Sequence, residues 1–264
     1  MLSTNISFYL PSLIKIIDET NLDFDWDNID NLFSKEIKAR TERANGETSI
    51  IEATLYDLIV EVKKENSQAG RLLDFFNKLW EELSINLTSE EKKLIKPTIR
   101  NILTAFDRRY LDFTGEILVL NNLIKSKIYR LEKVEEKLPN KKTIDFKLKC
   151  IADGSFKLVE IVNIHLDSSK VNSEENLIKT FLEGRLSKKI AAKKLLLDNV
   201  DFFLVPVLWG GWKDIQVYSE YFKKNKMHIQ NVIEPVSYLT FTDPNDISFV
   251  MHRFGNVSNL FNNN

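Results

Sequence analysis

The sequence contains few of the residues on which several kinds of site depend. It has a single cysteine, Cys150, so an internal disulfide and a cysteine-based zinc site are excluded. The histidines show neither HxH nor HxxxH spacing, so they form no zinc motif. No stretch of about eighteen apolar residues is present, so the sequence predicts no membrane-spanning helix. P-loop, GxGxxG and GxSxG motifs are also absent, which leaves nucleotide hydrolysis and esterase chemistry without support.

Glycine and proline are also scarce, and the net charge is close to zero. The 264 residues include 8 glycines and 6 prolines and carry a formal net charge of −1. With 43% apolar and 28% charged residues, this composition is typical of a folded globular chain with one large or two small domains. Any binding of nucleic acid must come from a local basic face. The start, MLSTNISFYLPSL, lacks the basic region of a signal peptide, and we expect a cytoplasmic protein that does not bind membranes.

The first part of the chain, residues 1–110, is predicted to form a helical domain. Apolar residues recur at three- and four-residue steps over 48–64 and 68–84, which is typical of amphipathic helices. Thr88-Ser-Glu-Glu91 has the spacing of a capping box and predicts the start of another helix. Pro97 lies inside that helical pattern and is expected to kink or restart the helix.

Residues 111–264 are predicted to form an α/β domain. A helix is expected over 114–127 with Glu116 in its first turn, and a long helix over 172–197. Alternating or continuous apolar runs predict strands over 127–136, 143–150, 156–166 and 201–209. The tail is expected to add a helix over 212–225 and one edge strand at 238–242. The predicted fold class is therefore a helical N-terminal domain followed by an αβββαβ core with a mixed sheet.

Two carboxylates lie in the paired strands of this core. Alternation places Asp145, Lys147 and Lys149 on one face of their strand, and Glu160 lies in the next strand among apolar residues. If the two strands form a hairpin, Asp145 and Glu160 can approach each other. A carboxylate in so apolar a run requires a metal, a cation or a shared proton when it is buried. Two converging acids provide the oxygen ligands that Mg²⁺ prefers.

This pattern resembles the core of the PD-(D/E)xK nucleases. The resemblance covers residues 112–209 and rests on Glu116, on Ile144-Asp145 and on VEIV at 159–162. It implies a restriction-endonuclease-like fold and a DNA or RNA endonuclease dependent on Mg²⁺ or Mn²⁺. The metal would bind Asp145 and Glu160, with Glu116 as a third or outer ligand. The family's lysine is replaced here by Val162.

Two interpretations of this replacement stay open. In the active one, Lys147 or Lys189 supplies the missing cation, and Glu116, Asp145 and Glu160 remain catalytic. In the inactive one, Arg185 or a lysine neutralises the acids directly, and the chain is a catalytically inactive binding or scaffold protein on a nuclease-like fold. Arg185 lies near the middle of the apolar face of the helix predicted at 172–197. A structural role for the acids in an unrelated α/β domain is the third alternative.

Partner binding can be assigned only to candidate surfaces. Basic residues cluster before the core and on the long helix, where they either form solvated faces or contact nucleic-acid phosphates. The candidates for nucleic-acid binding are Arg108, Arg109, Arg185, Lys188 and Lys193. The helical N-terminal domain is a candidate surface for a protein partner. The nuclease resemblance suggests a role in bacterial defence or mobile-element biology.

Overall fold

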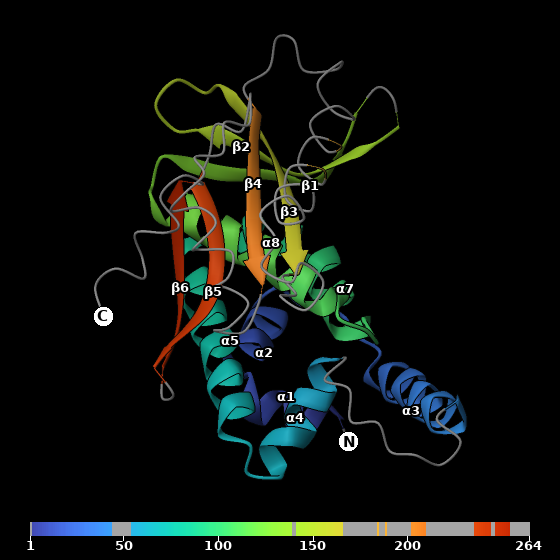
Figure 1. The fold of residues 1–264 in the computed structure, drawn as a ribbon. Helices are drawn as coiled ribbons and strands as arrows, with labels where there is room; N and C mark the ends of the chain where they lie inside the picture. Colours follow the sequence, from blue (N-terminus) through green and yellow to red (C-terminus); the bar gives the residue numbers. More distant parts are fainter. Residues whose placement is uncertain are drawn as a thin grey trace. The chain divides into compact units, whose positions relative to one another are not determined.

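The chain folds into two compact units, Met1–Lys125 and Ser126–Asn264. The computed structural model describes residues 2–43, 54–138, 141–165, 184, 188, 202–209, 235–243 and 246–253, the last two ranges for their backbone only. The first unit is helical and the second contains a sheet (Figure 1). The expected domain boundary at residue 110 stays a prediction. Within the described ranges, no helix is long and apolar enough to cross a membrane.

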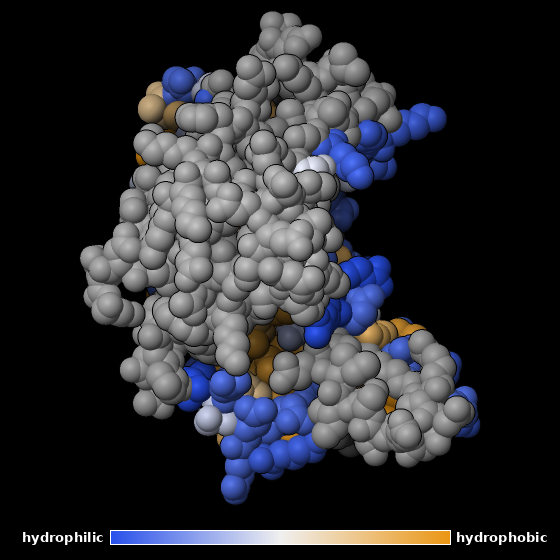
Figure 2. Space-filling model, in the orientation of Figure 1, coloured by the Kyte–Doolittle hydropathy of each residue, from blue (hydrophilic) through white to orange (hydrophobic). Residues whose placement is uncertain are grey.

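The described part of the first unit consists of helices that follow one another along the chain. They are α1 (Leu2–Tyr9), α2 (Pro11–Glu19), α3 (Trp26–Arg43), α4 (Leu55–Lys63), α5 (Ser67–Asn86), α6 (Ser89–Leu94), α7 (Lys96–Thr104) and α8 (Arg109–Lys125). Helix α2 packs on α5, and α7 packs on α8. Their shared core contains Leu13, Ile16, Leu73, Leu83 and Ile99, each exposed by 1% or less. On the face shown in Figure 2, the described residues are mostly hydrophilic with smaller hydrophobic areas.

Local signals set the bounds of several helices, as the sequence predicts. Helices α4 and α5 confirm the two amphipathic patterns, although residues 48–53 lie outside the described part. The capping box is confirmed, because Thr88 Oγ1 accepts from the Glu91 N–H at 3.3 Å and Glu91 Oε2 accepts from the Thr88 N–H at 2.8 Å. Pro97 restarts the chain as a new helix: α6 ends at Leu94, and α7 carries this proline in its first turn.

Helix α8 begins earlier than predicted. The expected start was residue 114, with Glu116 in the first turn, but the helix starts at Arg109. Asp107 explains the difference, because its Oδ1 accepts from the Arg109 N–H at 2.9 Å and so satisfies a backbone donor at the helix start. Glu116 therefore lies in the interior of α8, and Asp112 is the acid of its first turn.

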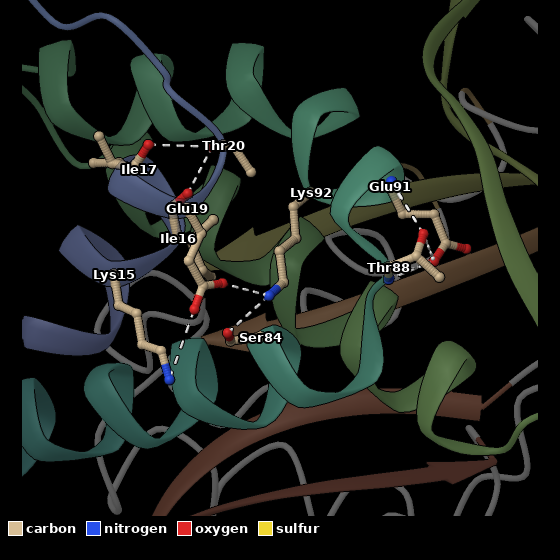
Figure 3. A network of polar contacts seen from close by, with 9 residues as sticks. All are labelled: Lys15, Ile16, Ile17, Glu19, Thr20, Ser84, Thr88, Glu91 and Lys92. Atoms are coloured by element: carbon tan, nitrogen blue, oxygen red, sulfur yellow. Dashed lines mark hydrogen bonds and ion pairs between the residues drawn. The ribbon is translucent and has the colours of Figure 1, made fainter.

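A polar network links helices of the first unit (Figure 3). The Lys92 ammonium, on α6, donates to Glu19 Oε2 at 2.7 Å and to Ser84 Oγ at 3.1 Å. Lys92 is only 8% exposed, so the two acceptors compensate for removing its charge from water. Lys15 adds a longer ion pair to Glu19 at 3.7 Å. The Lys92 ammonium lowers the pKa of the Glu19 carboxyl below its ordinary value.

The second unit contains a six-stranded mixed sheet with the order β1-β2-β3-β4-β5-β6. The strands are β1 (Tyr129–Lys137), β2 (Thr143–Cys150), β3 (Phe156–His165), β4 (Phe202–Trp209), β5 (Pro235–Asp243) and β6 (Asp246–Arg253). Strands β1, β2 and β3 pair antiparallel, whereas β3, β4 and β5 pair parallel. Helix α8, three antiparallel strands and a parallel fourth strand match the predicted α/β order. The expected helices over 172–197 and 212–225 lie outside the described residues, apart from helical Gly184 and Lys188.

Side-chain alternation explains how β2 divides into a core face and an outer face. Ile144, Phe146 and Leu148 are fully buried, whereas the residues between them are exposed or half-buried. Strand β4 is buried from Leu204 to Trp209, as expected for an apolar strand between β3 and β5. The outer face of β2 therefore presents Asp145, as alternation predicts.

The tail contributes two strands to the sheet, whereas the sequence predicts one edge strand there. Residues 238–242 belong to β5, which lies between β4 and β6 and is not an edge strand (Figure 1). The edge is β6, which pairs antiparallel with β5. Alternation of Ile247, Phe249 and Met251 in DISFVMHR is typical of a strand and was the overlooked signal.

Candidate functional site

Asp145 lies where the pairing of β2 with β3 ends. The antiparallel register runs from Lys149↔Phe156 to Phe146↔Val159 and stops there. One step further, Asp145 Oδ2 accepts a hydrogen bond from the Ile161 N–H at 2.6 Å. In a continued ladder that N–H would face the carbonyl of Ile144. The carboxylate thus replaces a backbone acceptor and is held against β3.

Glu160 is the neighbour of this anchoring point on β3. Its side chain is 2% exposed, and it lies among buried Val159, Ile161 and Val162. Extending the register by one pair places Glu160 opposite Asp145, with both side chains on one face of the sheet. On its other side Glu160 is level with Leu204 of β4. The hairpin expected from the sequence is present, and the convergence of the two acids on one site stays a prediction.

The positions that distinguish this chain from the nuclease pattern lie in the same strands. Val162 is 5% exposed and is paired with Pro206 of β4, so no cation is available at the position where the family has its lysine. Ile144, at the position of the family's proline, is fully buried. Both replacements are apolar side chains that contribute to packing.

Lys147 follows Asp145 on the outer face of β2 and lies in a polar cluster. Its Nζ is 3.6 Å from Glu136 Oε1 and 4.4 Å from the centre of the Phe156 ring. The other oxygen of Glu136 is 2.6 Å from Lys133 Nζ. The Lys133 ammonium lowers the pKa of the Glu136 carboxyl, and the Lys147 ammonium contributes in the same direction. In this arrangement Glu136 and Phe156 hold Lys147.

The proposed third acid belongs to the other compact unit. Glu116 lies in α8, in the unit that ends at Lys125, whereas Asp145 and Glu160 belong to the sheet unit. Among the residues that the structure describes, no group of three or more His, Cys, Asp or Glu side chains is arranged to hold a metal ion. The role of Glu116 as a ligand stays a prediction.

The candidate nucleic-acid contacts fall in different parts of the chain. Arg108 and Arg109 are exposed, and Arg109 Nε donates to Asp107 Oδ2 at 2.7 Å, which raises the pKa of the guanidinium. Lys188 is helical and exposed. Arg185, Lys189 and Lys193 lie outside the described residues, so the inactive interpretation based on Arg185 and the helper role of Lys189 stay predictions.

The carboxyl ends of β3 and β4 carry an aromatic pair. His165 stacks on Trp209 with ring centres 6.4 Å apart, and Trp209 Nε1 donates to Asn163 Oδ1 at 2.8 Å. Trp209 is only 4% exposed, so it contributes to packing and its indole N–H has the partner that burial requires. His165 is the last residue of β3.

Comparison with known proteins adds little to this geometry. The chain matches no family model and no curated protein. Among solved structures it is similar to SfsA from Pyrococcus furiosus, solved in complex with Ca²⁺, with a TM-score of 0.26 and 15% identity. The match covers 56% of this chain and 64% of that one, which is less than two thirds of SfsA. With a TM-score this low, the similarity carries no argument about function.

Sequence reasoning missed the partners of Lys147. Glu136 and Lys133 come from β1, and Phe156 opens β3. Phe156 was predictable, because it lies on the same face as Lys149 once the hairpin register is known. Glu136 was not, because Glu135 adopts a φ of 53° just before it and interrupts the regular alternation of β1.

Proposed function

We propose that this chain is a nucleic-acid-associated protein with a nuclease-like core, which hydrolyses phosphodiester bonds at Asp145 and Glu160. The observation that carries the proposal is the 2.6 Å hydrogen bond from the Ile161 N–H to Asp145 Oδ2. This bond holds one carboxylate beside the residue that follows a second, buried carboxylate. Two acids fixed by neighbouring strands form a preorganised site, because strands position side chains more precisely than loops do.

The donor set suits a hard divalent cation. Carboxylate oxygens are the ligands of Mg²⁺ and Mn²⁺, and Mg²⁺ commonly uses one or two carboxylates, leaving its other positions to water and phosphate. Asp145 and Glu160 would hold the ion. Such an ion, when bound, would polarise a phosphate and lower the pKa of an attacking water. The strand register and the Ile161 N–H would keep the two carboxylates oriented.

Lys147 is the helper cation that the described residues offer. It lies two residues after Asp145 on the same face of β2, about 7 Å along the strand. To serve the scissile phosphate, its ammonium would exchange the Glu136 carboxylate, now 3.6 Å away, for a phosphate oxygen. Lys189 remains the second candidate for this role.

Metal-dependent cleavage tests the proposal. Single-stranded and duplex DNA and RNA are incubated with the purified full chain in Mg²⁺, in Mn²⁺ and in EDTA. We expect cleavage only with metal, and a loss of roughly 100-fold or more in Asp145→Asn and Glu160→Gln. Asp153→Asn, in the turn between β2 and β3, is the matched control and should cleave normally. No cleavage of any substrate by the native chain, or equal cleavage by the two site variants, would overturn the proposal.

The second candidate function is binding without catalysis on the same fold. The observation that favours it is Val162, an apolar residue exposed by 5% at the position of the family's lysine. In this version a cation of the protein neutralises Asp145 and Glu160, and no metal binds. Calorimetric titration with Mn²⁺ separates the two candidates: saturable binding that Asp145→Asn abolishes supports the hydrolase. Nucleic-acid binding with no heat of Mn²⁺ binding supports the non-catalytic protein.

A further inference from the structure

The outer face of the β1–β2–β3 sheet carries positive charges in successive cross-strand rows. The register places Arg130 opposite Lys149, and Lys149 opposite Phe156. Lys133 lies opposite Lys147 in the next row. Residues directly opposite in antiparallel strands have their side chains on the same face, and so do residues two apart in one strand. Four cations therefore share one face.

The pairing of like charges is the unusual feature of these rows. Like charges directly opposite each other destabilise an antiparallel pair. Glu136 offsets part of the repulsion, because its carboxylate contacts both Lys133 and Lys147. One carboxylate shared by two ammonium groups leaves a positive excess in that row, to which Arg130 and Lys149 of the neighbouring row add. A polyanion bound across this face would relieve the repulsion.

An aromatic ring lies within the same face. Phe156 is 40% exposed, although burial is the usual state of so large an apolar side chain. The Lys147 ammonium lies 4.4 Å from its ring centre, a cation–π contact that confirms that the two side chains share a face. A basic surface with an exposed ring is the arrangement that binds unpaired nucleotides, since phosphates pair with the cations and a base stacks on the ring.

The rows continue along the strands to the two acids. Row one contains Lys149 and Phe156, and row two contains Lys147 and Leu158. Extending this register by one pair past its end places Asp145 and Glu160 next on the same face. Lys133 is 54% and Lys147 is 27% exposed, so a ligand can reach both. A nucleic-acid strand laid along this face would be led from the rows of cations toward Asp145, next to buried Glu160.

We infer that this face, which we call the basic rows (Arg130, Lys133, Lys147, Lys149 and Phe156), binds single-stranded nucleic acid and delivers it to Asp145 and Glu160. The inference rests on the proposed function for the fate of the strand, but binding itself requires neither metal nor cleavage. Single strands are favoured over duplexes because a ring can stack only on a base that is unpaired.

Binding in EDTA tests the inference apart from catalysis. Fluorescence anisotropy is measured with labelled single-stranded DNA, single-stranded RNA and duplex DNA at several salt concentrations, with the full chain. The key variant is Arg130→Gln/Lys149→Gln, since neither residue belongs to the proposed catalytic set. The matched control is Lys35→Gln/Lys38→Gln, which removes the same charge from exposed positions of α3 in the other unit.

We expect the native chain to bind single strands more tightly than duplex. In the key variant the plot of log K against log salt should become less steep by about 1.4, because each lost phosphate contact on a single strand contributes about 0.7 to the steepness. Phe156→Leu should weaken single-strand binding roughly fivefold or more, with little effect on duplex, since stacking contributes about 1–3 kcal/mol per base. The control variant should keep the native slope.

Three outcomes would overturn the inference: no binding of any single strand, a native slope in the key variant, or equal effects of Phe156→Leu on single strands and duplex. Circular dichroism confirms that each variant folds. If single strands bind through the basic rows but no metal-dependent cleavage occurs, the proposed hydrolase fails and the binding face stands. If cleavage occurs while the key variant binds normally, the face fails and the hydrolase stands.

Discussion

Glu91 in the helical unit and Asp145 in the sheet unit perform the same local task over very different sequence distances. Each carboxylate accepts a backbone N–H: Glu91 from Thr88, three residues away, and Asp145 from Ile161, sixteen residues away. The first bond caps the start of helix α6 and can be identified from the spacing of the two residues in the sequence alone. The second forms only when two strands pair, and it holds the carboxylate against Ile161, the residue after Glu160. A local bond stabilises one element, whereas the long-range bond holds a side chain of β2 against β3.

The largest stability difference is expected at the long-range bond. Asp145→Ala leaves the Ile161 N–H without its acceptor next to a side chain that is 4% exposed. An unsatisfied buried donor costs about 1–3 kcal/mol, so the free energy of unfolding in urea should fall by that amount. Asp145→Asn keeps an acceptor oxygen and should lose clearly less. Equal losses in the two variants would show that the hydrogen bond is not the cause.

The local capping box should contribute about the same or less, and a substitution at Thr88 removes its other hydrogen bond, from the Glu91 N–H to Thr88 Oγ1. Thr88→Ala removes the side-chain acceptor at the start of α6, and loss of such a cap costs about 0.5–2 kcal/mol, typically near 1. Ser89→Ala, one residue further on, is the control and should be nearly neutral. Urea denaturation measures both variants. If Thr88→Ala destabilised the chain more than Asp145→Ala, the contrast between local and long-range bonds would be reversed.

The Glu19–Lys92 pair offers a smaller, pH-dependent effect. Because Lys92 lowers the pKa of Glu19, this pair contributes stability above the ordinary glutamate pKa, and the contribution is lost as pH falls through the lowered value. Lys92→Met keeps the apolar stem but removes the charge. We expect the Glu19 carboxyl to titrate at a higher pH in this variant, as measured by NMR, and stability to depend less on pH in that acidic range. An unchanged Glu19 titration would contradict the role of Lys92.

The smallest effect is expected in the turn between β2 and β3. Asp153 Oδ1 accepts from the Ser155 hydroxyl at 2.7 Å and from the Ser155 N–H at 2.9 Å, and these bonds lower the pKa of Asp153 to about 2. The contribution of the carboxylate is present above the ordinary aspartate pKa and disappears as pH falls towards 2. Ser155→Ala should raise this pKa in an NMR titration without changing cleavage. A value that stays near 2 would exclude the Ser155 hydroxyl as the main cause.

Patterns that depend on neighbouring residues were predictable from the sequence. The capping box at Thr88, the restart at Pro97 and the strand over 143–150 follow from spacing, ring chemistry and alternation. The start of α8 was not predicted, because the Asp107 carboxylate begins the helix before the recognised pattern. The second strand of the tail was missed although its alternation was visible in the sequence.

The candidate site was predictable in part. Placing Asp145 and Glu160 on one face required only alternation and a hairpin, and both came from the sequence. The bond to the Ile161 N–H could not be predicted, because it depends on where the strand pairing ends. The contact between Lys147 and Glu136 could not be predicted either, since Glu136 reaches Lys147 only because the backbone turns at Glu135.

Residue order by itself thus determined the helical first part, the succession of strands and the acids that the strands carry, because these depend on contacts a few residues apart. The tertiary structure decided which groups the acids and lysines contact, and it gathered Arg130, Lys133, Lys147 and Lys149 into adjacent rows. The physical reason is that strand pairing brings together side chains from distant parts of the chain, and a register shifted by one residue would place them on opposite faces.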